Sequence, residues 1–169
     1  MKNKDSLVIV VLYYIGWFGS IFLARTDFSG FSLFFPFILM TFLYLRKSIN
    51  LKNLILAVCV SFFGILFDFS LIHFGFVTAA GELVLLIPLW RISIWLLFSF
   101  SMIKLGQSLN LPLWLSALLV LIMGPLSYKS REAFEVLSFS SSVVFLIYAC
   151  FWGLAFPLIL SLSRRAISK

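Results

Sequence analysis

The chain has 169 residues, of which 63% are hydrophobic and 11% are charged, with a net charge of +7 and a mean hydropathy of +1.15. A soluble domain is about 45–50% apolar and about 25% charged, and a chain of this length cannot hide so much apolar surface from water. The composition therefore excludes a water-soluble fold and predicts one integral membrane domain over residues 1–169, and the basic residues, which gather in short loops and at the termini, do not indicate nucleic-acid binding.

Apolar segments recur six times, each close to the roughly 20 residues that a helix needs to cross the hydrocarbon core. The expected helices cover residues 6–24, 28–45, 54–74, 83–105, 111–128 and 143–162. The first run is longer than the apolar region of a signal peptide, so we interpret it as an uncleaved helix. Pro36 predicts a kink in the second helix. The fold class is therefore all-α, a polytopic bundle of six transmembrane helices.

The distribution of Lys and Arg predicts the orientation. Six crossings place both termini on one side, and nine of the 13 basic residues then lie on that side, three lie on the other, and Arg91 lies inside a helix. The positive-inside rule therefore predicts that both termini are cytoplasmic. The polar link of residues 129–142 carries enough apolar residues to form a short helix on the opposite membrane surface.

Two opposite charges lie inside the apolar spans. An ionisable side chain at the centre of a membrane helix costs roughly 2.5–3.5 kcal/mol on insertion scales. Asp68 lies five residues before His73, and Arg91 lies nine residues after Glu82. At about 1.5 Å per residue, both side chains fall in the outer half of the membrane at overlapping depths, so we expect an ion pair between the third and fourth helices.

Three interpretations of this pair stay open. It can fix the register of two helices without contacting a ligand. It can form a site for a ligand or lipid headgroup, with Arg91 as the anion-binding group. It can also serve proton relay or catalysis.

Other polar and aromatic residues gather in the same half, whereas the cytoplasmic half is almost purely apolar. The sequence therefore predicts an outward-facing pocket. Its candidate ligand-binding residues are Asp68, Arg91, Trp90, Tyr128 and His73. Four further residues are candidates for structural roles, namely Gly124, Pro125, Pro88 and Gly75. We expect the Gly124-Pro125 step to break the end of the fifth helix and expose carbonyl groups.

The residue inventory indicates neither a metal site nor a cofactor. His73 is the only histidine, and Cys59 and Cys150 lie inside apolar spans without Cys/His spacing, as packing residues between helices. Ser127 has no G-x-S-x-G context, so no catalytic residue is assigned.

Several short motifs carry a family resemblance that spans nearly the whole chain. They are Gly16-Trp17-Phe18, Asp68 to Gly75, Pro88-Leu89-Trp90, Gly124 to Tyr128 (GPLSY), and Trp152 with Pro157. In this order they resemble a bacterial inner-membrane family catalogued as domain of unknown function 2878. The resemblance implies a small multi-pass protein of the inner (cytoplasmic) membrane of Gram-negative bacteria and supplies no mechanism. Where such proteins continue GPLSY with small residues, this chain has Lys129-Ser130-Arg131-Glu132.

Three functions are compatible with these features. The first is binding or transport of a small amphipathic molecule or lipid through the outward-facing pocket. The second is a scaffold role in a cell-envelope complex, with another membrane protein as partner. The third is intramembrane modification of a lipid.

Overall fold

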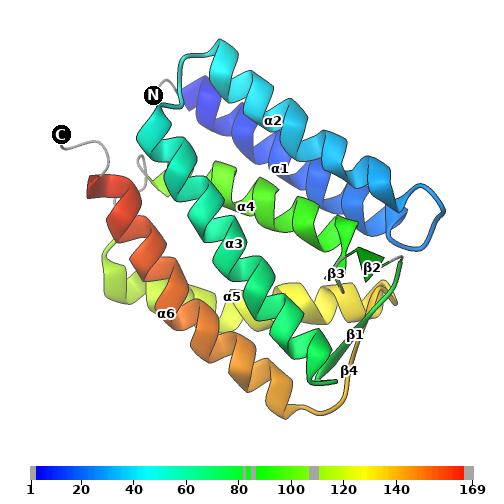
Figure 1. The fold of residues 1–169 in the computed structure, drawn as a ribbon. Coiled ribbons are helices and arrows are strands. Elements are labelled where there is room, and N and C mark those ends of the chain that lie inside the picture. Colours follow the sequence, from blue (N-terminus) through cyan, green and yellow to red (C-terminus); the bar gives the residue numbers. More distant parts are fainter. Residues whose placement is uncertain (1–2, 82, 85–86, 107–110, 166–169) are drawn as a thin grey trace.

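The computed structural model describes residues 3–81, 83–84, 87–106 and 111–165. The α-helices are α1 (Asn3–Leu23), α2 (Phe34–Leu45), α3 (Leu51–His73), α4 (Leu89–Gly106), α5 (Leu113–Ala133) and α6 (Val143–Arg165). A 3-10 helix, η1 (Ser29–Leu33), precedes α2. The short strands are β1 (Val77–Ala79), β2 (Leu83–Val84), β3 (Ile87–Pro88) and β4 (Leu137–Phe139). The all-α prediction is therefore confirmed, with the strands confined to one end of the bundle (Figure 1).

Five helices, α1, α3, α4, α5 and α6, are long and apolar enough to cross a membrane. Many of their large apolar side chains are exposed on the outside of the bundle, as in a helix bundle surrounded by lipid. These features indicate a multi-pass membrane protein.

The second expected helix is divided. The segment Ser29–Leu45 starts as η1, and the α-helix begins only at Phe34. Pro36 is the third residue of α2, and the Ser32 carbonyl, four residues before it, accepts a hydrogen bond from the Ser93 hydroxyl at 2.7 Å. Proline therefore lies near the start of an α-helix and not at the centre of a longer one.

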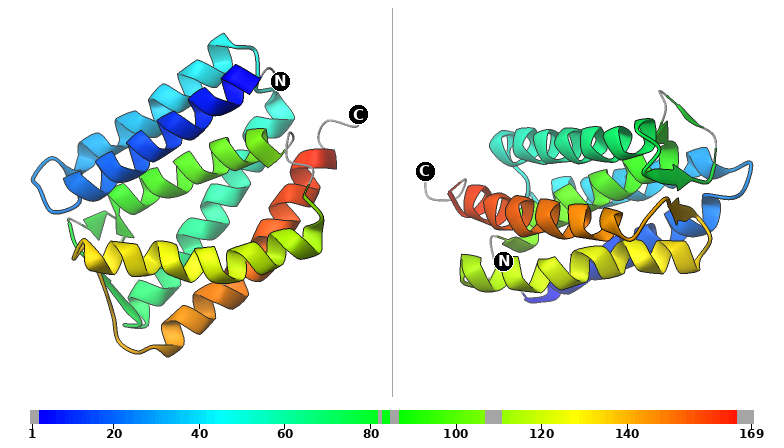
Figure 2. Two further views of the ribbon diagram at one scale, coloured as in Figure 1. Left: turned by 180° about the vertical axis from the view of Figure 1, so that it is seen from behind. Right: turned by 90° about the horizontal axis from the view of Figure 1, so that it is seen from below.

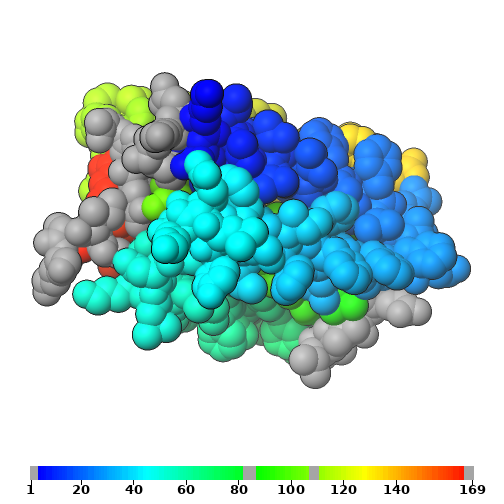
Figure 3. Space-filling view, turned by 90° about the horizontal axis from the view of Figure 1, so that it is seen from above, coloured from blue at the N-terminus to red at the C-terminus, as the bar shows by residue number. Residues whose placement is uncertain are grey.

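α4 lies at the centre of the bundle, in contact with α1, α2, α3 and α6. α1 and α2 run side by side over one face of it, and α5 packs mainly against α6 (Figures 1 and 2). Figure 3 shows the side chains of α1 and α2 together on that outer face. Small polar side chains allow the close approach of α4 to its neighbours: the Ser93 and Ser20 hydroxyls lie 3.1 Å apart, and those of Ser99 and Ser61 lie 2.6 Å apart.

The start of α1 and the end of α6 lie at the same end of the bundle, hereafter the terminal end, and the strands lie at the opposite strand end (Figure 1). Two hydrophobic clusters occupy these two ends. The cluster at the terminal end contains Ile9, Leu43 and Ile103. Buried polar residues lie in that half as well, including Asn53 and Ser163, so the expectation of an almost purely apolar half was wrong.

The fifth helix is longer than expected. α5 continues through Gly124 and Pro125 to Ala133, because a membrane helix tolerates an internal proline. The expectations that this step ends the helix and that residues 129–142 form a surface helix were therefore wrong. β4 occupies part of that link and pairs antiparallel with β1, with Val77 opposite Phe139.

The fourth helix starts later than expected. Residues Leu83–Val84 and Ile87–Pro88 pair as antiparallel strands, and α4 begins at Leu89. Pro88 is buried at the end of β3. Proline suits this position because the backbone N–H groups at the start of a helix have no partner within the helix, so the N–H group that proline lacks is not needed there.

α3 and α5 end with the same turn. At the end of α3, the Phe76 N–H donates to the Leu71 carbonyl and the Gly75 N–H donates to the Ile72 carbonyl, with Gly75 at φ +72°. This is a Schellman motif, in which glycine is favoured at the left-handed position. α5 forms the same bonds with Glu135 at φ +56°. The same turn therefore leads from α3 into β1 and from α5 into β4, and these two strands pair with each other.

Candidate functional site

Asp68 of α3 and Arg91 of α4 form the ion pair that the sequence predicts. The Arg91 Nε donates to Asp68 Oδ2 at 3.0 Å, and Arg91 Nη2 lies 2.5 Å from Asp68 Oδ1. The contact is therefore bidentate, which is the strongest geometry for this pair. Each side chain is only 1% exposed.

Two aromatic side chains complete the hydrogen bonds of the carboxylate. The Trp95 Nε1 of α4 donates to Asp68 Oδ2 at 2.7 Å. The Tyr128 hydroxyl of α5 donates to Asp68 Oδ1 at 3.4 Å. Both carboxylate oxygens therefore accept from two donors, as a buried charge requires.

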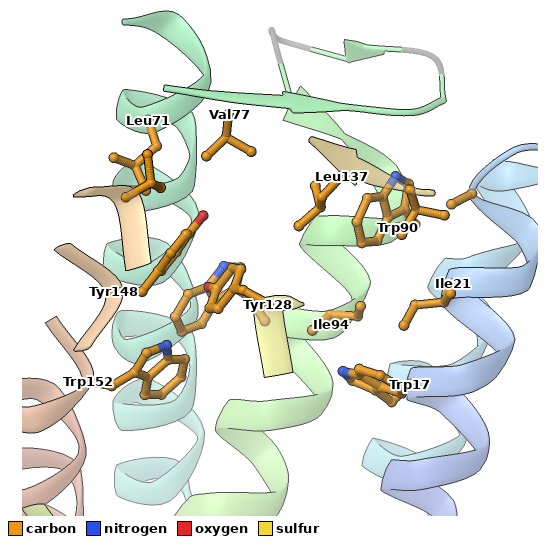
Figure 4. Packing of buried hydrophobic residues seen from close by; sticks show 14 residues of the cluster. Trp17, Ile21, Leu71, Val77, Trp90, Ile94, Tyr128, Leu137, Tyr148 and Trp152 are labelled. Carbon is orange, nitrogen blue, oxygen red and sulfur yellow. The ribbon is translucent and has the colours of Figure 1, made fainter. Parts of the chain in front are cut away.

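Arg91 also contacts the sixth helix. Its Nη2 donates to the Tyr148 hydroxyl at 3.4 Å, and the rings of Tyr148 and Tyr128 stack with centroids 3.5 Å apart (Figure 4). Arg91 Nη1 has no hydrogen-bond partner among the described residues. The pair thus connects α3 and α4 with α5 and α6, and its burial favours the structural interpretation, because a ligand could reach it only after rearrangement.

Trp90 faces the strand end. Its Nε1 donates to the Ala80 carbonyl at 2.7 Å. This hydrogen bond holds the segment between β1 and β2 against the buried Trp90 ring. In the same segment, Gly81 has φ +94°, and a Cβ atom there would lie 2.7 Å from the Ala24 carbonyl oxygen. Trp90 therefore holds a loop, and its ring centroid lies 5.8 Å from the Arg91 guanidinium.

His73 is not brought to the ion pair. It is exposed at the end of α3, and its ring stacks on Phe69 with centroids 5.6 Å apart. Glu82 lies outside the described residues. Cys59 and Cys150 are exposed, so their expected packing between helices was wrong. Within the described ranges, no group of three His, Cys, Asp or Glu residues could hold a metal ion.

A cavity of about 340 Å³ lies between α1, α4, α5 and α6, beside the ion pair. Its walls are mainly apolar and aromatic, and the lining side chains that carry a polar group are Tyr13, Tyr14, Trp95, Ser127, Tyr128, Arg131 and Trp152. Two lining residues, Tyr14 at 55% and Met123 at 61%, are exposed on the outer surface, so the cavity opens at the side of the bundle. Of the five candidate ligand-binding residues, only Tyr128 lines it.

Arg131 is the charged residue of this cavity, and it was not among the predicted site residues. It is only 6% exposed. Its guanidinium carbon lies 4.4 Å from the Tyr128 ring centroid and 5.8 Å from that of Trp17. Its Nε has no hydrogen-bond partner in the described part of the chain. Arg131 lies three residues after Tyr128, which puts both side chains on one face of a helix. This spacing could have identified Arg131 from the sequence only if α5 had been expected to continue past Tyr128.

Gly124 shapes the cavity wall. A Cβ atom at this position would lie 2.7 Å from Trp152 Cδ1, so glycine lets the Trp152 ring of α6 lie against α5. The Trp152 ring also stacks on Trp95 with centroids 5.3 Å apart. Through Trp95, the cavity wall and the ion pair therefore share one packed arrangement.

A comparison with protein families finds a match over most of the chain. The family model described as "Protein of unknown function (DUF2878)" matches residues 6–158. The chain belongs to this family. The match confirms the resemblance carried by the sequence motifs, and it covers the ion pair, the cavity and the paired strands. No curated protein and no solved structure shows a significant match, so the family supplies membership without an activity.

Proposed function

We propose that this chain binds a lipid or small amphipathic molecule within the bilayer, through the cavity between α1, α4, α5 and α6. The observation that carries the proposal is a cavity of about 340 Å³ with aromatic walls and a buried arginine. Small-molecule sites are concave and mostly apolar with a few placed polar groups, and they commonly measure about 300–1,000 Å³. Transport of the bound molecule would use the same site.

The side opening supports entry from the bilayer. Tyr14 and Met123 line the cavity and are exposed on α1 and α5, on surfaces that face lipid when the helices cross the membrane. An amphipathic molecule could therefore slide in from the membrane plane without crossing the headgroup layer. The pocket expected around Asp68 and Arg91 is replaced by one beside them, with Tyr128 shared between the pair and the cavity wall.

The proposed topology has six crossings, with both termini cytoplasmic in the bacterial inner membrane. Ser29–Leu45 would be the sixth crossing: five residues of 3-10 helix at about 2.0 Å each and twelve of α-helix at about 1.5 Å each span roughly 28 Å. The hydrocarbon core is about 30 Å thick. The excess of basic residues at the terminal end supports the orientation.

A cavity-filling substitution tests the function. Val120 lines the cavity on α5, and Val120→Phe would occupy its volume. The matched control is Leu119→Phe, because Leu119 is an exposed neighbour on the same helix. Protein purified in mild detergent would be extracted, and retained lipids and metabolites would be identified by mass spectrometry. We expect a species retained by the wild type and the control and lost from Val120→Phe.

The alternatives give different results. A scaffold would retain the same molecules in all three proteins and would copurify with a stoichiometric partner. If the protein is a lipid-modifying enzyme, deleting its gene would change the lipid profile of the cell. Equal retention by the wild type and Val120→Phe would remove the binding proposal.

A further inference from the structure

The cavity lining contains two buried hydrogen-bond donors that are unpaired. Arg131 Nε and Trp152 Nε1 are buried, and neither has a hydrogen-bond partner among the described residues. The Ser127 hydroxyl is engaged, since it donates to the Gly124 carbonyl at 2.8 Å. The described lining residues include no carboxylate. Unpaired buried donors cost free energy unless a partner satisfies them, so the cavity is suited to a ligand rich in acceptors.

Arg131 is held in place for such a ligand. Its guanidinium lies over the Tyr128 ring at 4.4 Å from the centroid, and Tyr128 is fixed in turn by its stack on Tyr148 and its bond to Asp68. A stacked guanidinium keeps its N–H edge free for bidentate contact with a phosphate or carboxylate. In the described part of the chain, no ion pair neutralises Arg131, whereas the nearby Glu132 and Glu135 pair with Lys129 and Arg25.

The depth of Arg131 matches that of a lipid headgroup. It lies two residues before the end of α5 at the strand end, or about 3 Å along the helix. The apolar lining residues Phe98, Met102 and Phe156 extend the cavity from there toward the middle of the bundle. A charged group at the strand end and an acyl chain toward the centre would therefore match both parts of the cavity.

We infer that the ligand is an acidic lipid whose phosphate or carboxylate binds Arg131, and the Trp152 indole N–H is a second unpaired donor in the same cavity. This inference rests on the proposed function and names its ligand class. A zwitterionic lipid is disfavoured because the described lining offers no carboxylate for its ammonium group. The volume of about 340 Å³ suits the acid group and part of one chain, and the remaining chain would stay in the bilayer.

Native mass spectrometry of the full chain in detergent tests the inference. The probes are dioleoyl phosphatidic acid, dioleoyl phosphatidylcholine, oleic acid and inorganic phosphate. We expect phosphatidic acid to bind the wild type more tightly than phosphatidylcholine, and inorganic phosphate not to bind, because it lacks a chain. Binding of oleic acid in place of phosphatidic acid would assign the acid group as a carboxylate.

Arg131→Gln should weaken binding of the acidic probe on the order of 10- to 100-fold, the range for losing a hydrogen-bonded charge. Arg131→Lys should retain part of the affinity, because it keeps the positive charge but loses the planar guanidinium that makes two hydrogen bonds to one acid group. The matched control is Lys47→Gln, which removes an exposed positive charge at the terminal end, far from the cavity, and should leave binding unchanged.

The two proposals fail differently. Equal binding of both phospholipids to the wild type, or an unchanged affinity in Arg131→Gln, would overturn the acidic-lipid inference while leaving the cavity as a binding site. No difference between the wild type and Val120→Phe for any probe would overturn the binding function itself. If Arg131→Gln fails to fold, the headgroup preference of the wild type and its loss in Val120→Phe decide the question.

Discussion

Asp68 and Arg91 show how a membrane bundle accommodates two charges. Each ion would carry a large desolvation cost alone, and a bidentate contact with further hydrogen bonds offsets that cost. Here Trp95 and Tyr128 add two donors to the carboxylate. The arrangement is consistent only when α3, α4, α5 and α6 are all in register, so the pair can act as a determinant of correct packing.

Removing one charge should therefore destabilise the protein more than removing both. Asp68→Asn would leave Arg91 buried without a counter-ion, and we expect a loss of about 3–5 kcal/mol in the free energy of unfolding. SDS titration of the purified protein would measure the loss. The double variant Asp68→Leu/Arg91→Met removes the unpaired charge but leaves Trp95 Nε1 and the Tyr128 hydroxyl without their acceptor, so it should recover only part of the lost stability.

Asp27→Asn is the matched control, because Asp27 is exposed in the loop after α1 and its change should have little effect. Stability in Asp68→Asn equal to the wild type would contradict a structural role for the pair. Loss of retained lipid in a stable Asp68→Asn would instead return the pair to the ligand site.

At the residue scale, sequence reasoning could find the ion pair and not the cavity. Asp68 and Arg91 stand out because charges are rare in apolar spans, and the helical rise places them at similar depth. Arg131 lies in a polar link with both charges and serines around it, and such arginines are usually solvated. Its burial depends on the side chains of Trp17 and Tyr128, which come from two different helices.

At the element scale, two glycines allow helices to approach through tryptophan rings. A Cβ atom on Gly64 of α3 would overlap the Trp95 ring of α4, and that ring is held by its bond to Asp68. In the same way, the absence of a side chain at Gly124 of α5 leaves space for the Trp152 ring of α6. Both glycines are buried, and their role is steric, since neither has positive φ.

Gly64→Ala should therefore disturb both the packing and the ion pair. The added methyl group must displace the Trp95 ring, and overpacking of this kind typically costs about 1–3 kcal/mol. Gly30→Ala is the matched control, because a Cβ atom there meets nothing closer than Leu89 Cδ1 at 3.7 Å. Thermal unfolding of both variants would measure the difference; similar midpoints would show that the Trp95 ring can move at little cost.

Helix existence could be predicted from hydropathy, whereas helix ends could not. α5 passes through GPLSY because a proline inside the membrane breaks a helix less readily than in water. Its true end uses Glu135 at positive φ, a position where glycine is the expected signal. The strands were missed for a related reason: β1 and β4 are three residues each and pair across 60 residues of chain, which no local pattern reveals.

At the scale of the whole molecule, the number of membrane crossings depends on whether the segment made of η1 and α2 crosses. Within the described residues, five helices are long and apolar enough to cross a membrane, and five crossings would put the termini on opposite sides. The start of α1 and the end of α6 nevertheless lie at one end of the bundle (Figure 1). The chain must therefore return from the strand end to the terminal end through η1 and α2, which run beside α1.

Cysteine labelling can test six crossings with cytoplasmic termini. With Cys59 and Cys150 replaced by serine, single cysteines would be placed at Ser141, in the exposed link before α6, and at Leu51, exposed at the start of α3. A membrane-impermeant maleimide added to spheroplasts should label Ser141→Cys and should reach Leu51→Cys only after permeabilisation, because the terminal end carries the excess of basic residues.

Fluorescent-protein fusions at each terminus separate the remaining cases. Six crossings with cytoplasmic termini predict fluorescence from both fusions, because green fluorescent protein exported unfolded through the secretion pathway does not mature. If η1 and α2 do not cross, one fusion stays dark. When the dark fusion is the C-terminal one, the labelling pattern of the two cysteines also reverses, and when it is the N-terminal one, the pattern is unchanged. An inverted bundle leaves both fusions dark, and the opening beside Arg131 would then lie near the cytoplasmic leaflet, so this result also decides which leaflet supplies the acidic lipid.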